Sequence, residues 1–183
     1  MKILIFGGSG SGTTTVGKAL AETLDFIHLD VDDYYWEQTT PAFQVKVSSM
    51  QRNAALLRDF RNHKNVIVSG SLVSWGAYWE TAFDLAVFIY LPMEIRMKRL
   101  DKREIERYGD LLFTVEATLE NSKAFLDWAQ RYDDENFKGR SKHIHEEWMK
   151  LLSCPVLKLM GELELKEQVD KILFAMPHSS ATK

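Results

Sequence analysis

The most informative segment of this chain for its fold is Gly7-Gly8-Ser9-Gly10-Ser11-Gly12-Thr13-Thr14. Its glycines let the backbone turn tightly, because glycine tolerates positive φ and has no Cβ to keep a ligand away. The segment follows a continuous apolar run at 2–6, typical of a strand buried on both faces, and precedes a helical pattern formed by Val16, Ala19 and Leu20. A glycine-rich turn between strand and helix directs successive N–H groups at a phosphate, with the positive end of the helix behind them. The sequence therefore predicts a phosphate-binding loop.

The loop fits the spacing G-x-x-x-x-G-K-[ST], with Gly7 as the first glycine, Gly12 as the second and Thr14 as a hydroxyl ligand for Mg²⁺. Thr13 stands where this motif has lysine. That lysine contacts the outer phosphates during transfer, and a charge-assisted hydrogen bond contributes about 1.5–3 kcal/mol. Its loss slows transfer by about tenfold to over a hundredfold unless another cation replaces it. Because Lys18 lies a turn further along the helix, we expect an arginine from elsewhere in the chain.

The predicted nucleotide site is the loop together with the first helical turn. It comprises Gly7, Gly8, Ser9, Gly10, Ser11, Gly12, Thr13, Thr14 and Thr15. The alternative is a glycine-rich turn that serves packing or binds another anion. Since most positions of the motif are in place, the missing lysine weakens the prediction of catalysis more than the prediction of phosphate binding.

The rest of the chain alternates short apolar runs with helical patterns, which indicates βαβ units and a parallel sheet. Further strands are predicted at 26–29, 66–68, 85–91 and 155–159. Helices are predicted at about 43–60, 93–107, 112–131, 141–152 and 162–174. The fold class is therefore α/β, with one domain over 1–176 and a flexible tail over 177–183.

The composition of the chain argues against several classes of protein. The net charge of −3 argues against a general nucleic-acid binder, because affinity for phosphate backbones needs a surplus of Lys and Arg. No apolar run approaches the length of a membrane span. The single cysteine, Cys154, excludes an internal disulfide and favours a reducing compartment, so we expect a cytoplasmic protein. We expect it to be a monomer or a homodimer.

The loop in its strand–helix setting resembles that of the P-loop nucleoside and nucleotide kinases, the group of adenylate, cytidylate and shikimate kinases, and the resemblance extends from Ile3 to about Leu173. The run Gly-Ser-Gly-Thr-Thr-Thr is similar to the loop of some archaeal-type cytidylate kinases, where threonine also replaces lysine. The resemblance implies a three-layer fold with a five-stranded parallel sheet in the order 2-3-1-4-5. It also implies ATP and Mg²⁺ as cofactors, acceptor-binding insertions and a helical lid at about 93–140.

Two carboxylates leave the second predicted strand at Asp30 and Asp32, and shikimate-type and nucleoside kinases carry a similar Asp-x-Asp. Residues at the C-terminal end of a parallel strand lie at the edge where ligands bind. We expect Asp30 to hold a Mg²⁺-bound water and Asp32 to orient or deprotonate an acceptor hydroxyl. Tyr35 and Trp36 would line the acceptor pocket. The alternative is an acidic surface turn, or helix capping by Asp32 or its neighbour.

The third predicted strand ends at Ser69-Gly70, where adenylate kinases resemble this chain but carry Asp-Gly. The serine removes the metal-associated carboxylate from that strand and moves this role to Asp30. Gly70 would permit the close approach of a ligand or of backbone.

The fourth predicted strand is followed by a helix that resembles the arginine-bearing lid of these kinases, with Arg99 and Arg103 in its Arg-Leu-x-x-Arg pattern. Residues at i and i+4 share a helix face, so both guanidinium groups can converge on phosphates and replace the missing lysine. The alternative is a solvated helix face, paired with neighbouring acidic residues.

Three further arginines are weaker candidates for substrate binding. Arg52 lies where nucleotide kinases bind the acceptor phosphate, or else is simply exposed. Arg131 and Arg140 precede the fifth strand and could close on phosphates, although Arg131 has acidic neighbours and a structural ion pair is equally plausible. His143 and His145 lack the spacing of a zinc-binding helix and are interpreted as ordinary helix residues.

Two functions remain open. The first is phosphoryl transfer from ATP to a small acceptor, with a nucleoside monophosphate ranked above a nucleoside or small polyol. The second is a catalytically weak regulatory protein that binds a nucleotide without turning it over. Thr13 and Ser69 support the second, since two expected catalytic groups are missing.

Overall fold

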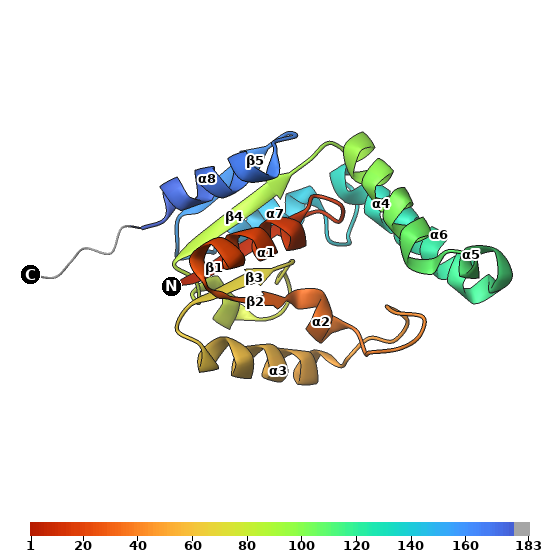
Figure 1. Ribbon diagram of the computed structural model, residues 1–183, viewed down its shortest axis with the longest axis horizontal. Helices are drawn as coiled ribbons and strands as arrows, with labels where there is room; N and C mark the ends of the chain where they lie inside the picture. Colours follow the sequence, from red (N-terminus) through yellow and green to blue (C-terminus); the bar gives the residue numbers. More distant parts are fainter. Residues whose placement is uncertain (178–183) are drawn as a thin grey trace, which may run out of the picture.

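A parallel five-stranded sheet forms the centre of the molecule in the computed structural model, which describes residues 1–177 (Figure 1). The order β2-β3-β1-β4-β5 confirms the predicted topology. The strands are β1 (Lys2–Gly7), β2 (Ile27–Asp30), β3 (Val66–Ser69), β4 (Leu85–Tyr90) and β5 (Val156–Met160). The predicted tail from 178 onward lies outside the described residues.

Helices cover both faces of the sheet, which is why β1, β3 and β4 consist mainly of buried apolar residues. The helices are α1 (Thr13–Leu24), α2 (Val31–Tyr35), α3 (Ser49–Asn62), α4 (Met93–Tyr108), α5 (Leu111–Thr114), α6 (Glu116–Gln130), α7 (Lys142–Met149) and α8 (Leu165–Ala175), with the 3₁₀ turns η1 (Ala77–Glu80) and η2 (Arg131–Asp133). Helices α1 and α8 pack on the face that presents Ile3 and Ile5. Residues of α3, η1 and α7 cover the opposite face around Leu4 and Phe6.

Helices α4, α5 and α6 form an arm that extends beyond the sheet (Figure 1). The prediction of one helix over 112–131 is wrong in detail, because Val115 is extended and separates α5 from α6. The buried face of α6 is also not the apolar face expected for this helix, Leu112, Val115, Leu119 and Leu126. It consists of Thr118, Ser122 and Ala129, and the Ser122 hydroxyl donates to the buried carboxylate of Glu104 at 2.9 Å. The arm is therefore held together partly by polar contacts.

The predicted start of a helix near residue 43 is also wrong, since α3 begins at Ser49. The Ser48 side chain accepts a hydrogen bond from the N–H of Gln51 and so caps the helix. Phe43 has φ +64, which is incompatible with a helix. Residues 36–48 instead fold back on themselves, with the N–H of Glu37 donating to Val45 O at 2.9 Å. We call this segment the strap.

The strap contacts the arm. The Tyr108 hydroxyl donates to Ala42 O at 3.1 Å, and the Asn121 amide donates to Gln44 Oε1 at 2.6 Å. These contacts join segments more than sixty residues apart in the sequence. Within residues 1–177, no helix combines the length and apolar character needed to cross a membrane.

Candidate active site

The phosphate loop, residues 7–14, connects β1 to α1 and turns so that the N–H of Ser11 donates to Gly8 O at 3.0 Å. Gly10 and Gly12 have φ of +83° and +94°, which side chains rarely adopt. A Cβ on Gly7 would lie 2.2 Å from the carbonyl oxygen of Ile89, so β4 leaves no space for a side chain there. Neighbouring backbone therefore fixes the shape of the loop.

Helix α1 begins directly after the loop without a side-chain cap at Gly12. Its first N–H groups therefore have no side-chain partner and are available to an anion. Among the described residues the Thr14 hydroxyl makes no hydrogen bond, and Asp30 uses only Oδ1 internally, as acceptor for the N–H of Asp32 at 3.0 Å.

These free oxygens are hard ligands and suit Mg²⁺, which is commonly held by one or two protein oxygens together with substrate phosphates. In the part of the chain that the structure describes, no three His, Cys, Asp or Glu side chains are grouped to hold a metal by themselves. The donor set thus fits an ion shared with a nucleotide.

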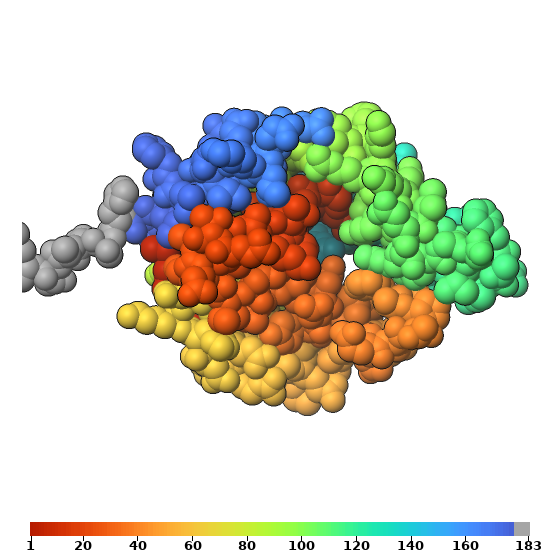
Figure 2. Space-filling view, viewed as in Figure 1, coloured from red at the N-terminus to blue at the C-terminus, as the bar shows by residue number. Residues whose placement is uncertain are grey.

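The Asp32 carboxyl lies in the first turn of α2, directly after β2. The side chain is exposed to solvent, yet protein atoms surround it, and Figure 2 shows a hollow between α1, the segment around α2 and the green arm. Burial and the charge of Asp30 raise the pKa of Asp32, whereas Arg140, Arg103 and Arg107 lower it. Three arginines therefore lie within electrostatic range of this carboxyl.

We call the group Asp32, Tyr35, Arg52, Arg103, Arg107 and Arg140 the acceptor cleft. The Arg52 guanidinium lies over the rings of Tyr35 and Trp75, 4.3 and 4.8 Å from their centroids. Its Nε is buried and has no hydrogen-bond partner. Trp36 packs edge-on against Tyr35, with ring centroids 5.0 Å apart. The buried, unpaired Nε of Arg52 therefore needs a water or an ion as its hydrogen-bond partner.

Arg99 and Arg103 share a face of α4 but contact different parts of the site. Arg99 Nη1 lies 3.9 Å from where a Cβ on Gly12 would be, beside the phosphate loop. Its Nη2 pairs with Glu162 Oε1 at 2.8 Å. Arg103 packs over Phe125 and has a buried Nε without a partner. The arm thus places Arg99 beside the phosphate loop and Arg103 within electrostatic range of Asp32.

Arg107 continues the same spacing by one more turn, and its role was not predicted. It pairs with Glu104 at 3.5 Å and packs over the ring of Phe43 in the strap at 3.9 Å. The i, i+4, i+8 series from Arg99 through Arg103 was the available signal. Contact with the strap could not be read from it.

Arg140 and Arg131 differ in their surroundings. Arg140 lies over the ring of Trp128 at 5.0 Å and, among residues 1–177, has no ion-pair partner. Burial lowers its pKa, although a guanidinium keeps its charge at neutral pH. Arg131 pairs with Asp134 at 3.6 Å and packs over Phe137 at the surface. The structure therefore brings Arg140 to Asp32 and leaves Arg131 in the alternative role of a surface ion pair.

Ser69 and Gly70, at the end of β3, both lie against neighbouring residues of the chain. The Ser69 hydroxyl lies 2.8 Å from Nε2 of His28, so the position that lacks a carboxylate is joined to β2 instead. Burial is the main cause of the lowered pKa of His28. Gly70 has φ +114, and a Cβ there would lie 2.7 Å from Cβ of Val31. Gly70 thus makes room for the start of α2.

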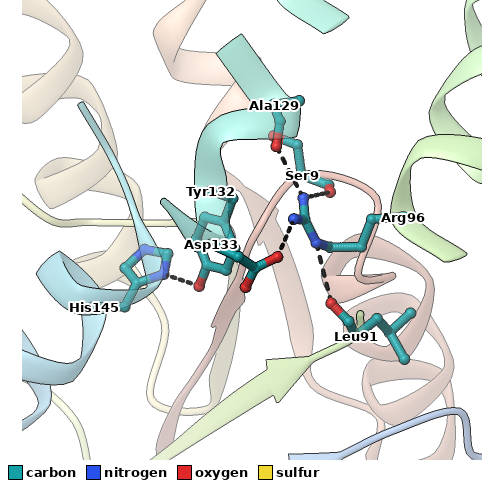
Figure 3. Close-up of polar contacts among 7 residues, drawn as sticks. All are labelled: Ser9, Leu91, Arg96, Ala129, Tyr132, Asp133 and His145. Carbon is teal, nitrogen blue, oxygen red and sulfur yellow. Dashed lines mark hydrogen bonds and ion pairs between the residues drawn. The ribbon is translucent and has the colours of Figure 1, made fainter. Parts of the chain in front are cut away.

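A buried polar network behind the phosphate loop was missed by the sequence analysis (Figure 3). His145 is fully buried, with Nε2 2.8 Å from the Ser71 hydroxyl and Nδ1 2.7 Å from the Tyr132 hydroxyl. Burial and the nearby Arg140 lower the pKa of His145 to about 3, so the ring is neutral at physiological pH. The Tyr132 ring in turn packs 3.0 Å from where a Cβ on Gly8 would be. His145 thus connects the end of β3 to the loop.

Known proteins are similar to this chain in sequence or in architecture. A family described as AAA domain matches residues 3–124. A Bacillus subtilis protein described as uncharacterized protein YqaC is 41% identical over 171 residues, which are 93% of this chain and 94% of that protein. A cytidylate kinase from Archaeoglobus fulgidus is 32% identical over 120 residues, which are 57% of this chain and 62% of the kinase.

Among solved structures, a shikimate kinase from Acinetobacter baumannii in complex with shikimate superposes with a TM-score of 0.56 at 20% identity, covering 95% of this chain and 91% of that one. This likeness shows the fold. Together with the match to the AAA domain, it agrees with the loop at the end of β1 and with the sheet order. The chain belongs to the P-loop nucleotide kinase superfamily.

Proposed function

We propose that the protein transfers the γ-phosphoryl group of ATP to a small anionic acceptor, with a nucleoside monophosphate as the first candidate. The observation that carries this proposal is the Asp32 carboxyl, which lies in an open cleft within electrostatic range of Arg103, Arg107 and Arg140. Parallel strands end at the same edge of a sheet, so Asp32 after β2 and the loop after β1 face one reaction space. The kinase relatives support the reaction class.

On the donor side, the N–H groups of residues 7–14 and the start of α1 bind the phosphate chain. Thr14 and Asp30 would hold Mg²⁺, which neutralises phosphate charge when it is bound. Arg99 lies beside Gly12 and supplies the cation that Thr13 cannot. Releasing Glu162 frees this guanidinium for the nucleotide.

On the acceptor side, the charge of the cleft selects the substrate. Three guanidinium groups, from Arg103, Arg107 and Arg140, lie within electrostatic range of the Asp32 carboxyl, and Glu104 pairs with only one of them, Arg107. The excess of positive charge favours an anionic acceptor. Two arginines of the acceptor cleft, Arg52 and Arg103, have a buried unpaired Nε that a phosphate or carboxylate oxygen would satisfy.

A hydroxyl acceptor, such as a nucleoside or small polyol, is the second candidate and is favoured by Asp32 itself. A hydroxyl must lose its proton as it attacks, whereas a phosphate acceptor is already ionised. The raised pKa of Asp32 moves toward the operating pH, where a carboxylate is a better general base. In this reaction the acceptor oxygen bonds to the γ-phosphorus, the bond to ADP breaks, and the proton moves to Asp32.

The test is ATP consumption with Mg²⁺ across nucleoside monophosphates, nucleosides and small polyols. We expect turnover with one acceptor class and loss of turnover in Arg140→Met, whereas Arg58→Met, an exposed arginine paired with Asp59, should match wild type. A Thr13→Lys variant addresses the regulatory alternative. Tighter nucleotide binding without transfer in this variant, together with no turnover in wild type, would overturn the kinase proposal.

A further inference from the structure

Arg96 is a completely buried arginine in the first turn of α4, and its guanidinium lies behind the phosphate loop (Figure 3). Nε donates to Leu91 O at 3.1 Å, and Nη1 donates to Ser9 O at 3.3 Å and Ala129 O at 3.2 Å. Nη2 donates to the Asp133 carboxylate at 2.9 Å. A buried charge needs such partners. Arg96 thus joins the loop to β4 and to the end of the arm.

The bond to Ser9 O fixes the direction of one loop peptide. In a trans peptide the C=O and N–H point in opposite directions. Because the Ser9 carbonyl is turned toward the Arg96 guanidinium, the N–H of Gly10 points away from that guanidinium. A Cβ on Gly10 would lie 2.8 Å from the Arg96 carbonyl oxygen, so the backbone of α4 also packs against this peptide.

The charge of Arg96 bears on the same site. The guanidinium is permanently positive, and Asp133 is the carboxylate that faces it within the described residues. Asp133 is only partly buried, whereas Arg96 is inaccessible to solvent. A buried positive charge acts on a nearby anion with little screening. The loop itself carries Thr13 in place of the usual cation.

We propose that Arg96 is a positioning residue for the phosphate loop of this lysine-lacking chain. It holds the Gly10 N–H toward the phosphate chain of the nucleotide and supplies from behind part of the positive charge that the lysine would supply. The inference rests on the proposed function only in taking a nucleotide as the ligand. It is therefore tested by equilibrium binding, which requires no transfer.

The first experiment removes the negative partner. Asp133→Asn keeps an oxygen acceptor for Nη2 but leaves the Arg96 charge uncompensated, so affinity for inorganic tripolyphosphate and for ATP should rise about fivefold at low salt. Asp134→Asn removes the same charge one residue away, where Asp134 pairs with the exposed Arg131, and should change affinity by less than about twofold. Calorimetry measures both.

An unchanged or lowered affinity in Asp133→Asn, with the melting temperature of wild type, would overturn the electrostatic role. A purely structural ion pair predicts that outcome, or a loss of affinity together with a loss of stability. An increase in affinity cannot arise from structural damage, and the direction of change therefore separates the two roles.

The second experiment keeps the charge and removes the geometry. The single ammonium group of Arg96→Lys cannot reach the Leu91, Ser9 and Ala129 carbonyls together. The NMR signal of the Gly10 amide should therefore shift, and the affinity for tripolyphosphate should fall about tenfold. Wild-type affinity in Arg96→Lys would overturn the positioning role. If this variant does not fold, Asp133→Asn decides.

The outcomes also separate this inference from the proposed function. Wild type that binds tripolyphosphate but phosphorylates no acceptor would remove the kinase proposal and leave the role of Arg96 intact. Wild type that binds neither tripolyphosphate nor ATP would remove both.

Discussion

The phosphate loop and the acceptor cleft are built from different kinds of chemical group. The loop presents backbone N–H groups, and its shape is fixed by contacts that exclude side chains at Gly7 and Gly10. The acceptor cleft presents side chains from α2, α3, α4 and the segment after η2. Backbone donors survive a change of side chain, so the loop can carry Thr13. In the proposed function, recognition of the acceptor instead depends on the arginine side chains of the cleft.

Gly7→Val should produce the largest effect on ATP binding, because it displaces the backbone that forms the phosphate loop. The new Cβ would lie 2.2 Å from Ile89 O, so the loop or β4 must move. We expect ATP affinity to fall by more than about a hundredfold, with a lower melting temperature. Calorimetry and thermal unfolding measure this, with Ala54→Val on the exposed face of α3 as control. Affinity within threefold of wild type would contradict it.

Asp32→Asn tests the role of the carboxyl in the cleft. With a hydroxyl acceptor, loss of the general base should lower kcat by about a hundredfold while ATP affinity is unchanged. With a nucleoside monophosphate, the fall should be less than about tenfold, because no proton has to be removed. Steady-state kinetics distinguish the two, with Asp127→Asn on the exposed side of α6 as control. Wild-type kcat with both acceptor classes would show that the carboxyl is not in the reaction space.

Arg52→Met should affect the acceptor and not the donor. A charge-assisted hydrogen bond from the unpaired Nε contributes about 1.5–3 kcal/mol, so we expect the acceptor KM to rise about tenfold or more. The KM for ATP should stay within twofold. The matched control is Arg58→Met on the same helix. A rise in the KM for ATP would instead place Arg52 on the donor side.

The pH dependence of stability gives a smaller effect of known sign. Burial and Asp30 raise the pKa of Asp32, so ionising it costs the folded state free energy above that pKa. Asp32→Asn should therefore melt at a higher temperature than wild type at pH 7. The difference should disappear as the pH falls through the raised pKa toward about 4, the ordinary value for aspartate. A lower melting temperature for the variant at pH 7 would contradict this environment.

Glu162→Gln should give the smallest effect. The pair with Arg99 is exposed, and such pairs contribute about 0–1 kcal/mol. Freeing Arg99 should tighten ATP binding by no more than about fivefold, and the gain should shrink as salt is added. Weaker binding in the variant would show that Glu162 holds Arg99 in its useful position.

Much of the fold and part of the site could be predicted from the sequence. The run 7–14 between a strand and a helix specifies a loop whose conformation depends on its own glycines. The carboxylates at 30 and 32 follow a strand, so their place at the sheet edge follows from local order. In contrast, the start of α3 and the break between α5 and α6 were predicted wrongly. The strap that precedes α3 contacts the distant arm through Tyr108, and the break between α5 and α6 lies at the extended backbone of Val115.

Local spacing was enough to predict the sheet, the phosphate loop and the place of the two carboxylates, because these features rest on residues a few positions apart. In contrast, the packing of distant segments sets which arginines approach Asp32, why Arg99 and Arg103 diverge, and that His145 and Arg96 lie behind the loop. An arginine on a helix has the same local pattern whether solvent or a cleft faces it. Its surroundings are set by packing between segments that lie far apart in the chain.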